Sequence, residues 1–422
     1  MINKTIYDQY INLLKKELVP ALGCTEPIAI AYACAKAREV LGKFPEKIII
    51  ECSGNIIKNV KGVIVPTTHD MRGVEASAIV GTVGGNASNK LEVLASVTEE
   101  DVETTRKLLK TDLCEVKLKK GVENLYINVL FKHKDDEAQV LIVDTHTNIV
   151  EIKKNDKVIF SSDHQDKKEN IYNKDIFNVD YIYEFANTVD VKDVEEVINT
   201  QIEYNSKIAN EGLHQSYGAN VGKVLLQHAH DVKTLAKAYP AAGSDARMAG
   251  CTLPVIINSG SGNQGMTVSL PVLKYAESLD VPKEKLIRAL VFSNLLALYQ
   301  KSGIGKLSAY CGAVSAACGA GAGISYLYDL PLDTIKMTIK NALGNVAGIV
   351  CDGAKSSCAA KIASSVDAAI MAHEMAMEGQ VYCGGEGLNL DDVDKTIENV
   401  SRLAKEGMKE TDISILEMMI SN

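Results

Sequence analysis

The sequence contains no long hydrophobic run. Its most apolar windows, such as Leu290–Leu298, are too short to span a bilayer, and the first twenty residues carry charges throughout instead of the apolar core of a signal peptide. Acidic residues outnumber basic ones, 54 to 45, and the net charge is −9. Such a balance argues against binding nucleic acid or anionic membranes through bulk charge. We therefore expect a cytoplasmic protein with neither as a partner.

Several common signatures of catalysis and metal binding are also missing. The sequence has no G-x-S-x-G, no H-E-x-x-H and no Walker A motif. Its cysteines form neither the C-x2–4-C pairs of zinc sites nor the C-x2-C-x2-C run of ferredoxins. The sequence therefore gives no sign of these common catalytic and metal-binding sites.

The remaining pattern predicts an α+β fold in which an α/β domain is inserted into a large Gly/Ala-rich helical domain. Residues 1–44 have helical periodicity and are expected to pack back onto the C-terminal part. Residues 45–165 form the α/β unit, since β-branched runs such as KIIIECSG, NVKGVIVP, EVLASV and LYINVLFKH predict strands. SDHQDKKENIYNKD resembles a linker. Residues 178–422 are almost entirely helical in period and form the large helical domain.

Ten cysteines are spread over the whole chain. A chain without an export signal rarely forms structural disulfides, so they are either buried filler or functional groups. Two pairs, Cys311/Cys318 and Cys351/Cys358, have a spacing of two helical turns, which also suits a packed helix face. Asp, Gly and Lys between the second pair, including Gly353, predict a loop or helix end there. By spacing alone, packing and metal binding both stay open.

LGCTEP places a cysteine immediately before a predicted helix. Thr25 is a suitable N-cap, and Glu26 and Pro27 suit a first helical turn. The helix dipole and free N–H groups would favour the Cys24 thiolate and lower its pKa. Cys24 is therefore a candidate reactive thiol, and the alternative is a cysteine that packs at a turn.

NSGSGNQG contains a literal G-x-G-x-x-G at Gly260, Gly262 and Gly265. A dinucleotide-binding fingerprint needs a helix and a second strand to follow, and Pro271 is expected to interrupt that helix. We interpret the segment instead as a loop whose N–H groups hold a small carboxylate.

Five segments in order, covering essentially the whole chain, resemble the L-cysteine desulfidase family, which is related to the α-chain of iron–sulfur L-serine dehydratases. They are LGCTEPIAIAYA, KNVKGVIVP, SGSGNQG, CGAVSAACGAGAGI and VCDGAKSSCAAK. CDGAK followed by a second cysteine is the most specific. The resemblance implies a lyase without pyridoxal phosphate, in which three cysteines hold an oxygen-sensitive [4Fe–4S] cluster and one iron is open to the substrate.

Carried over by motif, the resemblance implies Cys311, Cys351 and Cys358 as cluster ligands, and Cys24 as the catalytic thiol or a displaceable fourth ligand. The last two cysteines lie closer together than in the serine dehydratases and Cys318 is near, so a trio with Cys24 in place of Cys358 stays open. The remaining expected substrate-binding residues are Asn59, Thr68, Asn263, Gln264 and Lys355, the last of which is otherwise an ordinary surface lysine.

The expected reaction is β-elimination of L-cysteine to pyruvate, ammonia and hydrogen sulfide, with the substrate thiolate on the open iron. Two alternatives stay open. One is an L-serine dehydratase with the same cluster, and the other is a zinc protein or anion-binding module without enzymatic activity. A homodimer is also left open.

Overall fold

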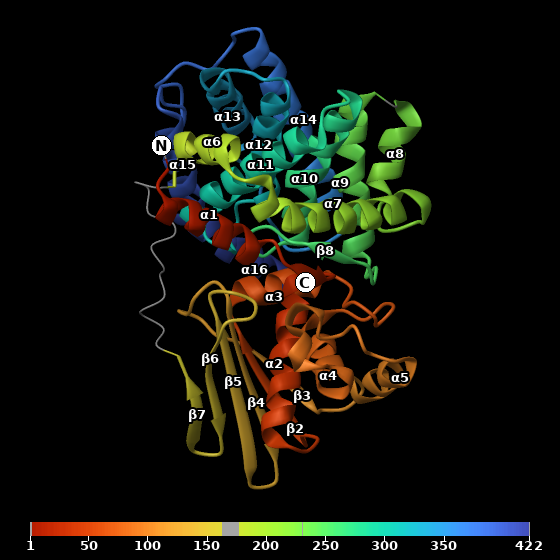
Figure 1. Cartoon of the computed structure of the whole chain (residues 1–422). Helices are drawn as coiled ribbons and strands as arrows, with labels where there is room; N and C mark the ends of the chain where they lie inside the picture. The colour runs from red at the N-terminus through yellow and green to blue at the C-terminus, as the bar shows by residue number, and fades with distance from the viewer. Residues whose placement is uncertain (1, 163–176, 230, 422) are drawn as a thin grey trace.

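The computed structural model describes residues 2–162, 177–229 and 231–421, and Figure 1 shows a helical body joined to a smaller α/β unit. This confirms the predicted α+β class with its large helical part. Among the described residues no helix has the length and apolar character needed to cross a membrane. The predicted linker lies, apart from its first residue, outside the described ranges.

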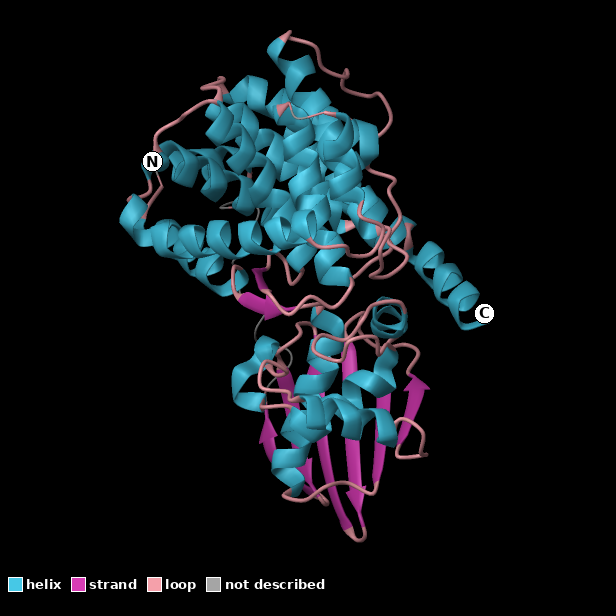
Figure 2. Cartoon of the chain, turned by 90° about the vertical axis from the view of Figure 1, so that its right-hand side faces the viewer, coloured by secondary structure: helices cyan, strands magenta, loops and turns pink. Residues whose placement is uncertain are grey.

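A six-stranded mixed sheet forms the centre of the α/β unit, in the order β3-β2-β4-β5-β6-β7. β2 pairs parallel with β3 and antiparallel with β4, and every later pair is antiparallel. Helices cover one face (Figure 2). The strands are β2 (Lys47–Cys52), β3 (Cys114–Leu118), β4 (Tyr126–His133), β5 (Asp136–Val143), β6 (Ile149–Lys154) and β7 (Lys157–Ser161); the helices are α2 (Thr25–Leu41), α3 (Gly54–Lys61), α4 (Gly73–Gly84), the 3-10 helix η1 (Ala87–Glu92) and α5 (Glu99–Leu108).

The helical body contains the first helix of the chain and the helices that follow the sheet. They are α1 (Lys4–Glu17), α6 (Val179–Thr188), α7 (Val191–His214), α8 (Val221–His228), α9 (Val232–Met248), α10 (Gly262–Ser278), α11 (Lys283–Ile304), α12 (Gly312–Leu327), α13 (Leu332–Val346), α14 (Cys358–Met377), α15 (Val393–Arg402), the π-helical turn η3 (Leu403–Gly407) and α16 (Lys409–Ser421). A short antiparallel pair, β1 (Pro20–Leu22) with β8 (Pro254–Ile256), joins the two units.

Small residues place α12 at the centre of this body, where it contacts α10, α11, α13 and α14. A Cβ atom at Gly319 would lie 2.7 Å from the Ser293 carbonyl oxygen of α11, and one at Gly321 would lie 3.0 Å from the Ala369 carbonyl oxygen of α14. Only glycine permits such close approach of helix backbones. The Gly/Ala-rich sequence therefore lets the middle of α12 pack closely between its neighbours.

Three local expectations differ from the structure. Residues 1–44 do not pack as one unit, because α1 joins the helical core while α2 is buried against the sheet and α4. NVKGVIVP is not a strand, since its first residues end α3, which Ser53 caps by accepting a hydrogen bond from the Ile56 N–H. EVLASV lies at the end of η1 and in the following turns. In the last two cases helix capping and tertiary packing outweigh the β-propensity of valine.

Candidate active site

A cavity of about 100 Å³ lies where the two units meet, and four cysteines line it: Cys24, Cys311, Cys351 and Cys358. Asn59 of α3 reaches it from the α/β unit, while Asn263 and Gln264 reach it from the start of α10. Seven of the nine side chains expected to form the site therefore surround one small space, although they come from five separate parts of the sequence.

Backbone pairing brings two of these cysteines together. Tyr310 and Val350 form an antiparallel bridge. On either side of it, the Cys311 N–H donates to the Ile349 carbonyl at 3.0 Å and the Cys351 N–H donates to the Ala309 carbonyl at 2.6 Å. Cys311 is then the N-cap of α12. The bridge explains how residues forty apart in sequence present neighbouring thiols.

The third thiol belongs to Cys358, at the end of a loop that turns at Gly353. Gly353 has φ of +94°, a left-handed conformation that suits glycine, and Cys358 begins α14 at the end of this loop. Its Sγ lies 3.7 Å from the Gly353 carbonyl oxygen. The predicted break in helical structure between Cys351 and Cys358 is therefore present.

The three thiols affect one another electrostatically. Burial, and after it the nearby Cys351 and Cys358, raise the pKa of Cys311 to about 12. Burial also raises the pKa of Cys358. The three residues are half-buried. Their thiols would deprotonate more readily if a metal centre joined them, because a thiolate binds metal and is stabilised by it.

Cysteine thiolates are the donors that iron–sulfur clusters use, and those of Cys311, Cys351 and Cys358 line this cavity. Within the described ranges no group of three or more His, Cys, Asp or Glu side chains is close enough to hold one metal ion. In a cluster each cysteine ligates a different iron, so the thiols surround the group without sharing one centre. The alternative fourth cysteine of this region, Cys318, lies in the helical core with its Sγ 3.9 Å from the Ile339 carbonyl, outside the cavity lining.

Lys301 of α11, which sequence reasoning did not identify, also lines the cavity. Its side chain is buried, and burial lowers the pKa of its ammonium to about 8, while Cys351 and Cys311 act in the opposite direction. It forms no ion pair with a described carboxylate. A buried ammonium without a counter-ion is costly, so the cavity favours an anionic occupant.

Cys24 has a different environment from the one expected. It is itself the N-cap of α2, and Thr25 is the first helical residue, whose hydroxyl donates to the Gly260 carbonyl at 2.9 Å. Burial and then the Glu26 carboxylate raise the pKa of Cys24 well above its usual value. The predicted lowering is wrong, because full desolvation and an adjacent negative charge outweigh the helix dipole.

Glu26 is held as a carboxylate by its neighbours. It accepts a hydrogen bond from Cys24 Sγ at 3.0 Å and one from Asn59 Nδ2 at 3.1 Å, and His146 Nε2 lies 3.8 Å away. Burial alone would raise the pKa of Glu26, but His146, Cys24 and the charge of Arg247 bring it down to about 2. The sequence indicates only that Glu26 belongs to the first turn of a helix and does not identify its contacts beside the cavity.

Arg247 provides an unsatisfied donor beside the glycine-rich loop. It is only 2% exposed, its guanidinium Nη1 donates to Asn263 Oδ1 at 3.1 Å, and its Nε has no hydrogen-bond partner in the described structure. Gln264 Oε1 is likewise buried and unpartnered. Such orphaned groups mark a place where a polar ligand belongs. Nothing in the helical sequence around Arg247 distinguishes it.

The glycine-rich loop is present as expected, but the helix that follows it does not end where it was predicted to end. Ser259 and Gly260 have φ of +51° and +79°, and α10 begins at Gly262 and continues through Pro271 to Ser278. The prediction that Pro271 stops this helix is wrong. The preceding strand β8 nevertheless has only three residues and pairs antiparallel with β1, whereas a dinucleotide fingerprint follows a strand of a parallel sheet.

Thr68 and Lys355 do not line the cavity. The Thr68 hydroxyl donates to the Val65 carbonyl within its own turn at 2.7 Å. Lys355 pairs with Asp352, and its side chain is one-third exposed. Both side chains therefore interact with residues of their own turn or loop.

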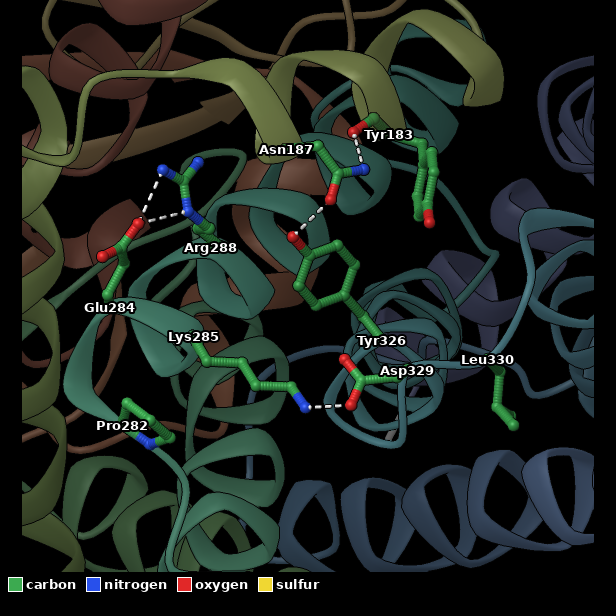
Figure 3. A pocket seen from close by; sticks show the side chains of 9 residues that line it. All are labelled: Tyr183, Asn187, Pro282, Glu284, Lys285, Arg288, Tyr326, Asp329 and Leu330. Atoms are coloured by element: carbon green, nitrogen blue, oxygen red, sulfur yellow. Dashed lines mark hydrogen bonds and ion pairs between the residues drawn. The ribbon is translucent and has the colours of Figure 1, made fainter.

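A larger cavity, of about 360 Å³, lies on the helical body and contains no cysteine. Figure 3 shows its side chains pairing with one another. Arg288 binds Glu284 at 2.8 Å, Lys285 binds Asp329 at 2.6 Å, and the Tyr326 hydroxyl donates to Asn187. This outer cavity leaves its polar groups satisfied.

Known proteins are similar to this chain over most of its length. A family model described as the serine dehydratase alpha chain matches residues 88–417. A UPF0597 protein of Lachnoclostridium phytofermentans is 56% identical over 99% of this chain and all of its own length. One of Desulfitobacterium hafniense is 51% identical over 98% and 97% of the two chains, and one of Treponema denticola is 47% identical over the full length of both.

The fold and site thus define a serine dehydratase-like protein of the lyase class. The chain belongs to the serine dehydratase alpha-chain family. The motifs predicted a relationship to this family.

Proposed function

We propose that this protein is a [4Fe–4S]-dependent L-cysteine desulfidase that eliminates hydrogen sulfide from L-cysteine and yields pyruvate and ammonia. The observation that carries the proposal is the convergence of Cys311, Cys351 and Cys358 on one cavity that also contains an unpartnered donor, Arg247 Nε, and an unpartnered acceptor, Gln264 Oε1. The cysteines would hold the cluster, and Lys301 would offset part of its negative charge. When bound, the cluster supplies a Lewis acid to which the substrate sulfur is a suitable soft ligand.

The remaining residues would bind and orient an amino acid. Arg247 Nε is a charged donor for the substrate carboxylate, and Asn263 and Gln264 lie beside it with amide groups. Glu26 is a buried carboxylate that can accept a hydrogen bond from the substrate ammonium. These contacts would place the Cα–H bond near Cys24 and the β-sulfur toward the three thiols.

Cys24 is the proposed base for the Cα proton. As a thiol it donates to Glu26. A substrate ammonium beside both groups would favour release of the thiol proton to solvent, because an added positive charge opposes the effect of burial, and the resulting thiolate would take the Cα proton. The Cα–H electrons then form the Cα–Cβ double bond while the Cβ–S bond breaks and the sulfur leaves with its electron pair. The aminoacrylate released from the site tautomerises to an imine and reacts with water to give pyruvate and ammonia.

A second candidate is L-serine dehydration in the same cavity, which the matched family model favours. The two functions differ in the leaving group. Purified anaerobic protein would be given L-cysteine and L-serine separately, with pyruvate measured for both and sulfide for the first. A higher kcat/KM for L-cysteine supports the proposal, whereas turnover of L-serine alone would replace it with the second candidate.

Iron and acid-labile sulfide would be measured on the same preparation. About four of each per chain are expected for a cubane cluster. A colourless protein that contains stoichiometric zinc, or one without metal and without either activity, would contradict the proposed function.

A further inference from the structure

Lys58 of α3 is a buried cation outside the proposed mechanism. Its side chain is 1% exposed, yet its ammonium has two partners from distant parts of the chain. One is the carboxylate of Asp412 in α16, and the other is the backbone carbonyl oxygen of Cys351, at 3.3 Å. Lys58 therefore connects the last helix directly to the loop that carries two of the proposed cluster ligands.

The backbone of α3 also presses against this loop. Gly353 faces the Lys58 carbonyl oxygen so closely that a Cβ atom at that position would collide with it, and one at Gly62 would lie 3.3 Å from the Ala354 carbonyl oxygen. The residue after Lys58, Asn59, donates to Glu26, which accepts the Cys24 hydrogen bond. One helix of the α/β unit thus contacts both sides of the candidate active site.

α16 contacts α3 along a short row and lies beside it in Figure 1. Besides the Asp412–Lys58 pair, the Lys61 ammonium donates to the Met419 carbonyl and Leu416 packs over Gly54. A cavity of about 890 Å³ borders this row, lined in part by Ile413 and Leu416. The Asp412–Lys58 ion pair is thus one of several contacts that attach α16 to α3.

We propose that Lys58 and Asp412 are positioning residues that hold the Cys351–Gly353 loop in place, so that the C-terminal helix controls the order of the cluster-binding loop. Without Asp412 the Lys58 ammonium would be a buried charge without a counter-ion, and it would leave the Cys351 carbonyl to reach solvent. The loop would then open more often. Only the consequence for iron rests on the proposed function; the coupling of helix and loop does not.

The test compares Asp412→Asn with Glu410→Gln in full-length, iron-free protein. Both variants remove one negative charge from α16, but Glu410 is exposed. Amide hydrogen exchange at residues 351–354 and the rate of Cys351 alkylation by iodoacetamide, read by peptide mass spectrometry, are expected to rise about tenfold in Asp412→Asn only. Exchange in β4 should not change, which separates local opening from a general loss of stability.

Lys58 is tested by Lys58→Met and Lys58→Arg. The methionine variant is expected to reproduce the effect of Asp412→Asn, while arginine, which retains the charge and can donate to both partners, restores slow exchange. If Lys58→Met does not fold, the Asp412→Glu and Asp412→Asn pair provides the same comparison. Unchanged loop exchange and alkylation in Asp412→Asn would overturn the inference.

Iron gives a separate readout. In anaerobically loaded protein, Asp412→Asn is expected to lose iron to a chelator about tenfold faster than Glu410→Gln. If the wild-type protein binds no iron while loop exchange still responds to Asp412→Asn, the proposed function fails and the coupling stands. If iron binds and neither readout responds, the coupling fails and the proposed function stands.

Discussion

The outer cavity of the helical body and the cysteine-lined cavity differ in a way that volume does not reveal. The outer cavity, at about 360 Å³, is the more spacious, but its arginine, lysine and tyrosine already have protein partners. The cysteine-lined cavity holds only about 100 Å³ and leaves Arg247 Nε and Gln264 Oε1 without partners in the described structure. Since native proteins satisfy most buried polar groups, unmet hydrogen-bonding capacity locates the site better than size.

The largest effect is expected from a change to one of the cysteines that line the smaller cavity. Cys351→Ser is expected to lose the iron and all measurable turnover, because a serine hydroxyl is a poor replacement for a soft thiolate ligand. Iron content, visible absorption and pyruvate formation would be measured anaerobically. Cys383→Ser, at an exposed cysteine, is the matched control and should retain both. Full iron content in Cys351→Ser would remove Cys351 from the ligand set.

Cys24 tests whether the fourth thiol differs from the other three. Cys24→Ala is expected to retain most of its iron and to lose turnover by about 10²–10⁴-fold, the usual effect of losing a general base. Single-turnover kinetics and iron assays on the same sample measure the two properties. Unchanged turnover would make Cys24 a packing residue, and complete loss of iron would make it a permanent ligand.

A pair of arginine variants compares the cavities directly. Arg247→Lys is expected to raise KM for L-cysteine about 10–100-fold, since lysine does not reproduce the fixed geometry of the guanidinium and its charge-assisted hydrogen bonds. Arg288→Lys, the same change in the outer cavity, should leave KM within about twofold, because surface ion pairs contribute little energy. Steady-state kinetics decide between them, and equal effects would contradict the distinction between the cavities.

The smallest effect is expected from Tyr326→Phe in the outer cavity. The variant loses the 2.8 Å hydrogen bond to Asn187 and should reduce the free energy of unfolding by about 1 kcal/mol. Denaturant titration would measure that loss, and turnover should not change. A large fall in activity at unchanged stability would indicate that the outer cavity takes part in function.

Sequence patterns predicted the elements whose signals are local. The strands β2 and β4, the loop between Cys351 and Cys358, and the glycine-rich loop at Gly260 all follow from residue types at their own positions. Patterns failed where a distant partner decides the outcome. α2 was grouped with the helical body on its periodicity, but its all-round apolar surface is buried against the sheet.

Some residues of the candidate site could likewise be identified from the sequence, and others only from the structure. Motifs indicated Cys24 and the Asn263–Gln264 pair, because unusual residue types stand together there, and the resemblance to a known family implied the three proposed ligands. Arg247 and Lys301 lie in ordinary helices, and only packing reveals that each is buried beside the cysteines. Their importance comes from missing partners, which is a property of three-dimensional surroundings.

The chemistry of Cys24 shows most clearly what each level determines. Its position before a helix follows from the sequence, and so does the identity of its neighbour Glu26. The direction of its pKa shift does not, because burial depends on the α/β unit and the helical body closing over it together. Local sequence provides the dipole of a helix, but the tertiary structure determines solvent exclusion and the distances between charges, and here those two effects are larger.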